Sequence, residues 1–148
     1  MEVRFQPATS ADIDPVVVLI REFYVHDQHV FDETLTLPAL RTLLENPQYG
    51  GVWLVVVGET LAGYFLMTYG FALESGGRDL LIDEFYLREA YRRQGIGHQI
   101  IAFAREFCAR QGIRKIYLEV EGHNAAARAF YEREGFVFDG SIFMGLTL

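Results

Sequence analysis

The chain has 148 residues, a length that suits one compact domain with a substantial buried core. Its composition is 51% hydrophobic and 14% aromatic, which excludes a disordered protein. The formal net charge of −7 argues against nonspecific nucleic-acid binding, because such binding needs a large basic surface. An acidic chain is instead suited to cationic partners such as amines.

The single cysteine, Cys108, excludes an internal disulfide framework and favours a reducing compartment. The first residues, MEVRFQPATS, show no basic-then-apolar signal pattern, and no apolar run reaches the ~18 residues needed to span a bilayer. We find no repeat, linker or low-complexity tract. We therefore expect one cytoplasmic domain over residues 1–148.

The hydrophobic pattern of the first half predicts a strand, two helices and then a hairpin of two strands. These elements are expected at residues 3–8, 9–27, 36–46, 52–57 and 61–70. Ser10 or Asp12 can cap the first helix, and Pro15 suits its first turn. The segment Gly58-Glu59-Thr60 reads as the hairpin turn.

The second half predicts alternating strands and helices, followed by two short strands. They are expected at residues 78–87 (strand), 93–111 (helix), 113–120 (strand), 124–134 (helix), 136–140 and 141–148 (strands). Gly112 and Gly135 end the two helices, and Asn124 caps the second. The pattern indicates an α/β (α+β) fold in the order βααβββαβαββ. Its mixed, mostly antiparallel sheet would have six to seven strands, with helices on both faces.

The loop Arg92-Arg93-Gln94-Gly95-Ile96-Gly97 stands between a predicted strand and the start of a predicted helix. The first turn of a helix carries unpaired N–H groups and partial positive charge. The two glycines remove Cβ atoms that would keep a ligand from those donors, and the arginines add forks suited to phosphate oxygens. The loop is either an anion-binding helix start or a glycine turn with solvated arginines.

Two common phosphate-binding motifs do not fit this loop. The dinucleotide fingerprint requires a third glycine where this chain has Ile100. The nucleotide-triphosphate loop requires Lys and then Ser or Thr where this chain has His98 and Gln99.

The loop RRQGIG after the strand IDEFYL resembles the acyl-CoA motif Q/R-x-x-G-x-G/A of the GCN5-related N-acetyltransferases, the GNAT superfamily. The later segment IYLEVEGHNAAARAFYEREGFV is similar to that family's strand, Asn and A-x-x-F-Y-x-x-x-G-F helix. The order of elements over nearly the whole chain also fits. The resemblance implies a GNAT fold and transfer of an acetyl group from acetyl-CoA to an amine.

The resemblance also implies a cofactor-binding set. Backbone amides from Arg93 to His98 would hold the CoA pyrophosphate, and backbone groups around Phe85 and Leu87 would bind pantetheine. Asn124 would contact the pantetheine or cap its helix. Tyr131 would lie near the sulfur as general acid. The full set is Phe85, Tyr86, Leu87, Arg92, Arg93, Gln94, Gly95, Ile96, Gly97, His98, Asn124, Ala127 and Tyr131.

Attack on a thioester requires a neutral amine, and a carboxylate that takes its proton is the simplest way to obtain one. Asp83 and Glu84 are adjacent on a predicted strand, so alternation places at most one of them in the site. Asp83 stands two residues before Phe85, so alternation places the two side chains on the same face of the strand. Asp83 also matches a Glu position of the family's polyamine and glucosamine-phosphate acetyltransferases. We expect Asp83 to be the base or amine anchor, directly or through water, with Glu84 second; alternatively Asp83 pairs with Arg78 or Lys115.

The segment HDQHVFDE, residues 26–33, is rich in possible ligands, but its spacing does not favour a metal site and we expect none. In the family the corresponding region lines the acceptor pocket, and its sequence loosely resembles the diamine and polyamine acetyltransferases. Tyr24, Asp27 and Glu33, together with Asp83, are therefore the expected substrate-binding residues.

The expected function is acetylation of a primary amine on a small molecule by direct attack within a ternary complex. Two alternatives stay open, a protein or peptide acetyltransferase and a non-catalytic acyl-CoA-binding regulator. A homodimer is also expected, because dimers are common among relatives and the predicted final strands offer an edge for pairing.

Overall fold

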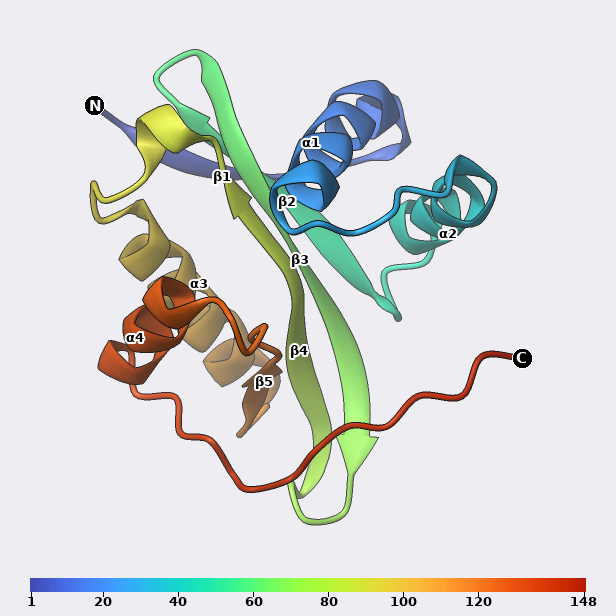
Figure 1. Cartoon of the computed structure of the whole chain (residues 1–148), viewed down its shortest axis with the longest axis vertical. Helices are drawn as coiled ribbons and strands as arrows, with labels where there is room; N and C mark the ends of the chain where they lie inside the picture. Colours follow the sequence, from blue (N-terminus) through green and yellow to red (C-terminus); the bar gives the residue numbers. More distant parts are fainter.

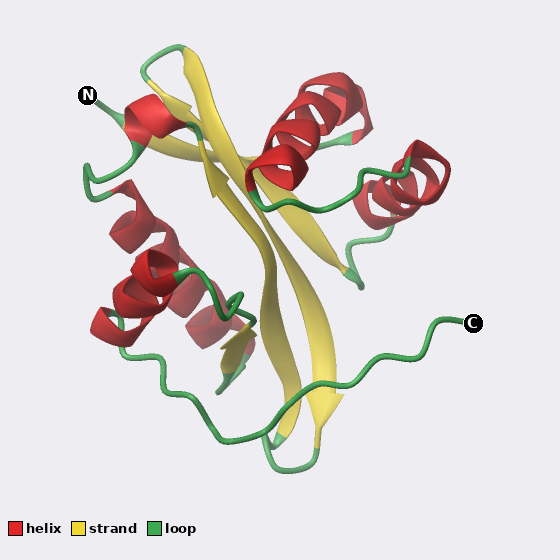
Figure 2. Ribbon diagram, in the orientation of Figure 1, coloured by secondary structure: helices red, strands yellow, loops and turns green.

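The computed structural model, which describes residues 1–148, is built around one twisted five-stranded sheet (Figures 1 and 2). The strands lie in chain order: β1 (Val3–Pro7), β2 (Gly50–Val57), β3 (Thr60–Ala72), β4 (Gly77–Leu87) and β5 (Ile116–Leu118). The pairings from β1 to β4 are antiparallel, whereas β5 runs parallel to β4. The mixed, mostly antiparallel α/β fold is as predicted.

Helices cover both faces of the sheet, two on each side (Figure 1). One face carries α1 (Ile13–His26) and α2 (Glu33–Glu45), and the other carries α3 (Ile96–Gln111) and α4 (Ala125–Arg133). Two short 3-10 turns, η1 (Ser10–Asp12) and η2 (Glu89–Tyr91), precede α1 and follow β4. None of these helices is both long enough and apolar enough to cross a membrane.

Alternation along the central strands divides the core into two clusters. Phe65 and Met67 of β3 face α3 and pack with Ile100. Tyr64 of the same strand faces the other way and packs with Leu19 of α1. The sheet is therefore apolar on both faces, which explains the nearly continuous hydrophobic runs of β2 and β3.

The helix starts differ from the predictions by a few residues. Asp12, one of the two predicted caps, occupies the N-cap position of α1 but makes no side-chain cap hydrogen bond there. Thr9, rather than Ser10, caps the preceding turn η1, in a reciprocal capping box with Asp12. The second helix begins at Glu33, three residues earlier than expected, because the Asp32 side chain accepts a hydrogen bond from the Thr34 amide.

The prediction of six to seven strands was wrong, because the last two expected strands do not form. Residues 136–148 run as an irregular segment away from α4 (Figure 1). The preceding strand β5 has only three residues rather than the eight expected, so it offers a short edge for a further strand. Alternating hydrophobic residues predict a strand, but a strand also requires a partner with free backbone groups.

The sheet opens between β4 and β5, and this opening positions the candidate site. Pairing of the two strands covers only Leu80–Ile82 with Ile116–Leu118. Beyond Ile82 the outer edge of β4 has no strand partner. Chain segments from α1, α4 and the loop after β5 surround this exposed edge (Figure 2).

Candidate active site

The free edge of β4 presents backbone groups at alternate residues. The Arg88 amide bonds to Ala62 of β3, so the peptide groups of Phe85 and Leu87 face outward, away from β3. The Leu87 carbonyl already accepts a 2.7 Å hydrogen bond from Arg92 Nε. This edge can therefore pair with an extended ligand, as expected for pantetheine.

The start of α3 supplies unpaired donors next to that edge. Gly95 has a left-handed conformation (φ 81°) as N-cap, and no side chain caps the helix. The first helical bond is made by the Gln99 amide to the Gly95 carbonyl, so the amides of the three residues between them are free for a ligand. No acidic residue lies in this first turn. The arrangement fits a pyrophosphate group.

Replacing Gly95 with alanine is expected to lower stability and to weaken acyl-CoA binding together. A Cβ at this position would meet no atom within 4 Å, so the cost comes from the left-handed backbone, about 1–2 kcal/mol. Thermal unfolding should shift down by ~2–4 °C per kcal/mol, and calorimetry should show weaker CoA binding. Gly145→Ala is the control, because that glycine also has open space but no positive φ. Unchanged stability of Gly95→Ala would contradict the conformational argument.

A β-bulge changes the geometry expected for the two carboxylates. Leu66 pairs with Glu84 and Met67 with Ile82, so Asp83 is the extra residue on β4. Simple alternation of side chains therefore fails here. The prediction that Asp83 lies on the same face of the strand as Phe85 was wrong. Burial raises the pKa of Tyr24, and the charges of Glu84 and then Asp83 raise it further, which indicates that both carboxylates lie near this tyrosine.

Glu84 is held in place by two tyrosine hydroxyls. Tyr24 of α1 donates to Oε2 at 2.8 Å, and Tyr64 of β3 donates to Oε1 at 2.7 Å. Burial raises the pKa of Glu84, an effect that the two hydrogen bonds partly offset. Both carboxylate oxygens are thus occupied, which suits a structural and electrostatic role better than proton transfer.

Asp83 is the less constrained carboxylate of the pair. It makes no side-chain hydrogen bond or ion pair, and the residue is exposed at the open edge. Burial by the surrounding protein nevertheless raises the pKa of its carboxyl group. The alternative pairing does not form, since Arg78 lies over the Tyr69 ring and Lys115 over the Tyr117 ring. Asp83 can therefore accept a proton from a bound molecule.

The raised pKa of Glu84 predicts a pH-dependent stability difference. A carboxyl group whose pKa is higher in the folded state stabilises that state when protonated, and this contribution is lost as pH rises. Relative to Glu84→Gln, the wild type should lose unfolding free energy as pH rises from below the ordinary value of 4.5 through the raised pKa. Urea unfolding across that range measures it, with exposed Glu59→Gln as control. A difference independent of pH would contradict the prediction.

Tyr131 projects from α4 into a cluster of aromatic rings at the same opening. Its ring centroid lies 6.2 Å from that of Phe85 on β4 and 5.8 Å from that of Phe136. Burial, together with the charge of Asp27, raises the pKa of Tyr131 to about 12. Its hydroxyl makes no hydrogen bond to the protein, so the phenol stays protonated and available.

Three ionisable side chains link the loop after α1 to the loop after β5 at the mouth of the opening. His29 Nε2 lies 3.3 Å from Asp27 Oδ2 and 3.3 Å from Glu121 Oε1. Gln28 (φ 59°) ends α1 in a Schellman turn, in which the His29 amide bonds to the Tyr24 carbonyl. Burial raises the pKa of Glu84, and the charge of His29 offsets a small part of that rise, which indicates that the bridge lies near Glu84.

The remaining predicted residues have simpler roles. Asn124 caps α4, accepting a 3.1 Å hydrogen bond from the Ala127 amide. Glu33 pairs with Arg21 on the outer side of α1 and is not part of the carboxylate group. Arg93 (φ 58°) and Gln94 lie exposed in the turn before α3.

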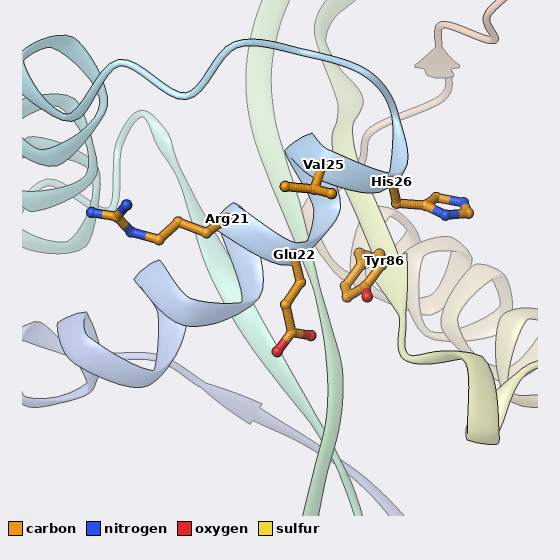
Figure 3. A pocket seen from close by; sticks show the side chains of 5 residues that line it. All are labelled: Arg21, Glu22, Val25, His26 and Tyr86. Carbon is orange, nitrogen blue, oxygen red and sulfur yellow. The ribbon is translucent and has the colours of Figure 1, made fainter.

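An open hollow lies on the α1 side of β4 (Figure 3). Figure 3 shows the His26 and Tyr86 rings close together, with Arg21 pointing away from them. The Tyr86 side chain is thus on the face opposite Phe85, and its peptide groups face β3 rather than the free edge, so Tyr86 contributes no backbone group to that edge. Glu22, which also lines the hollow, accepts two hydrogen bonds from Arg88 at 2.9 and 3.0 Å and fixes α1 to the end of β4.

Sequence reasoning did not assign Tyr64, His29 or Glu121 to the site. Tyr64 lies in a hydrophobic strand, where a tyrosine reads as core. Glu121 is more than ninety positions from His29, and only the folded chain brings them together. The only available signal was a charged loop directly before the Asn-capped helix.

Comparison with known proteins decides the family. The sequence model of the acetyltransferase (GNAT) family matches residues 17–136, which include the carboxylates, the glycine loop and Tyr131. The chain belongs to the GNAT family of acetyltransferases. It is accordingly an acyl-CoA-dependent N-acetyltransferase, as the sequence motifs predicted.

Individual relatives agree with this assignment. A 59-residue stretch is 39% identical to an uncharacterized N-acetyltransferase, YycN, of Bacillus subtilis, covering 40% of this chain and 38% of that protein. The thialysine N-epsilon-acetyltransferase of Bos taurus is 25% identical over 90% of this chain and 83% of its own length. Among solved structures, an integron cassette protein from a salt-marsh metagenome superposes with a TM-score of 0.84 at 28% identity, covering 97% of this chain and 90% of that one.

Proposed function

We propose that this GNAT enzyme transfers the acetyl group of acetyl-CoA to the primary amine of a small cationic molecule. The observation that carries the proposal is the grouping of Asp83 and Glu84 at the β4 bulge with Tyr131 on the opposite side of the same opening. The carboxylates attract an ammonium group, and the nearby strand edge and α3 start fit an acyl-CoA.

Asp83 is proposed as the base. An alkylamine with a pKa near 10.4 is neutral in roughly one molecule in a few thousand at pH 7. Asp83 takes the ammonium proton, directly or through water, and the freed amine attacks the thioester carbonyl. A C–N bond forms, the C–S bond breaks, and the nitrogen releases its second proton to solvent to leave the amide. The sulfur receives a proton from the Tyr131 hydroxyl. Solvent restores the proton of Tyr131 and removes that of Asp83, so no covalent enzyme intermediate is needed.

The acceptor class is inferred from charge. Asp27 and Glu121 each lie 3.3 Å from His29, whose charge acts on Glu84 of β4, so two further carboxylates stand at the mouth of the opening. A surface of this kind favours a cationic amine over a neutral or anionic acceptor. The Bos taurus relative, named for acetylation of the ε-amine of thialysine, is consistent with a small amine acceptor.

A turnover screen tests the proposal. Purified protein is mixed with acetyl-CoA and with separate panels of polyamines, aminoglycosides, amino acids and peptides, while release of free thiol is followed. We expect release with at least one small cationic amine. Release with peptides alone would overturn the acceptor class. Binding of acetyl-CoA without thiol release on any panel would favour the non-catalytic regulator.

A homodimer and a cytoplasmic location remain proposals based on the sequence. The expected pairing edge of the final strands is absent, but residues 137–148 expose several large hydrophobic side chains that a second copy would cover. Sedimentation of the full chain measures the association, and a monomer at micromolar concentration would contradict it.

A further inference from the structure

The helix that carries Tyr131 is weakly attached to the rest of the molecule. None of the residues of α4 is fully buried. Phe130 and Tyr131 pack against the core on the α3 side, while the rest of the helix consists of small alanines and charged residues and is largely exposed. The position of the Tyr131 hydroxyl therefore depends on a small number of contacts.

Two of these contacts are made by the first turn of α3. His98 Nδ1 lies 2.9 Å and 3.1 Å from the two carboxylate oxygens of Glu134, the residue that follows α4. The Phe130 ring lies so close to Gly97 that a Cβ there would be 3.0 Å from the ring atom Cζ. Arg105, farther along α3, also donates to the Glu134 carbonyl.

The placement of these contacts connects two parts of the site. Gly97 and His98 belong to the first turn of α3, whose backbone amides are free for an anionic ligand. Phe130 and Glu134 flank Tyr131 along the chain, one residue before it and three residues after it. The Glu134 side chain is only 13% exposed, so its carboxylate is enclosed at the junction of the two helices.

We infer that His98 and Glu134 are positioning residues, which hold the Tyr131 helix against the ligand-binding turn of α3. The close approach of Phe130 to Gly97 sets the spacing of the two helices, and the His98–Glu134 pair sets their rotation. The inference rests on the proposed role of Tyr131 as acid. A hydroxyl displaced by about 1 Å from its productive position can cost up to a hundredfold in rate, so a modest surface pair can have a large kinetic effect.

The test compares His98→Ala, Glu134→Ala and the double variant in the full chain. We expect kcat to fall about tenfold in each single variant, and no further in the double, because both remove the same pair. The dissociation constant of CoA, measured by calorimetry, should change by less than about twofold, since the α3 amides are backbone groups. Amide hydrogens of residues 125–133 should exchange about three- to fivefold faster. His98→Gln keeps a side-chain donor and should recover part of kcat.

Arg128→Ala is the matched control, because it removes an ion pair to Glu132 that lies entirely within α4. The inference is overturned if His98→Ala keeps the wild-type kcat, if it weakens CoA binding by the same factor as kcat, or if Arg128→Ala has an equal effect. If the wild type shows no turnover with any amine, the proposed function fails separately. Hydrogen exchange then decides alone, and unchanged exchange of α4 in His98→Ala would refute the positioning role.

Discussion

Tyr131→Phe is expected to lower kcat by about a hundredfold or more, while the affinity for CoA stays nearly unchanged. The leaving thiolate needs a proton, and a phenol with a pKa of about 12 keeps its proton throughout the neutral range. The hydroxyl makes no hydrogen bond to the protein, so its removal leaves the packing against Phe85 and Phe136 intact. Single-turnover kinetics and calorimetry with CoA separate the two effects.

The control for this change is Tyr49→Phe, which removes a hydroxyl from an exposed residue before β2. It should leave both kcat and CoA affinity unchanged. If Tyr131→Phe weakened CoA binding by the same factor as kcat, Tyr131 would be a binding residue rather than the acid. Full activity of the variant would show that solvent protonates the sulfur.

Much of this fold follows from local pattern. The periodicity of α3 and the left-handed Gly112 that ends it could be predicted because both depend on residues near in sequence. The bulge at Asp83 could not, since it depends on how β4 pairs with a separate strand. The lost strands after Gly135 show the same limit, because alternating hydrophobic residues do not reveal whether a partner edge is available.

The site shows the same division between local and long-range information. Two motifs, the glycine loop and the segment from Asn124 to Gly135, were enough to predict a candidate acyl-CoA site and a role for Tyr131. The partners of Glu84 come from α1 and β3, and the partners of His29 come from two loops on either side of the opening. Gly97 was interpreted as clearance for a ligand, but the structure adds a packing reason, the Phe130 ring.

Asp83→Asn is expected to lower kcat/KM for the amine by about two to three orders of magnitude at neutral pH. Asparagine keeps the size of the side chain at the bulge but cannot accept the ammonium proton. Burial raises the pKa of Asp83, so the wild-type rate should rise with pH through a value above the ordinary 3.8. That dependence should disappear in the variant. Rates measured from pH 4 to 9 with a saturating acyl donor test both effects.

Glu84→Gln separates the two carboxylates. Both oxygens of Glu84 already accept hydrogen bonds from Tyr24 and Tyr64, so this variant should change the amine KM more than kcat. The opposite result would be loss of the rise in rate with pH in Glu84→Gln and its retention in Asp83→Asn. The base would then be Glu84, and one tyrosine would have to release the Glu84 carboxylate during the reaction. The bulge makes this comparison informative, because it brings two adjacent carboxylates to one opening and leaves only one of them without a partner.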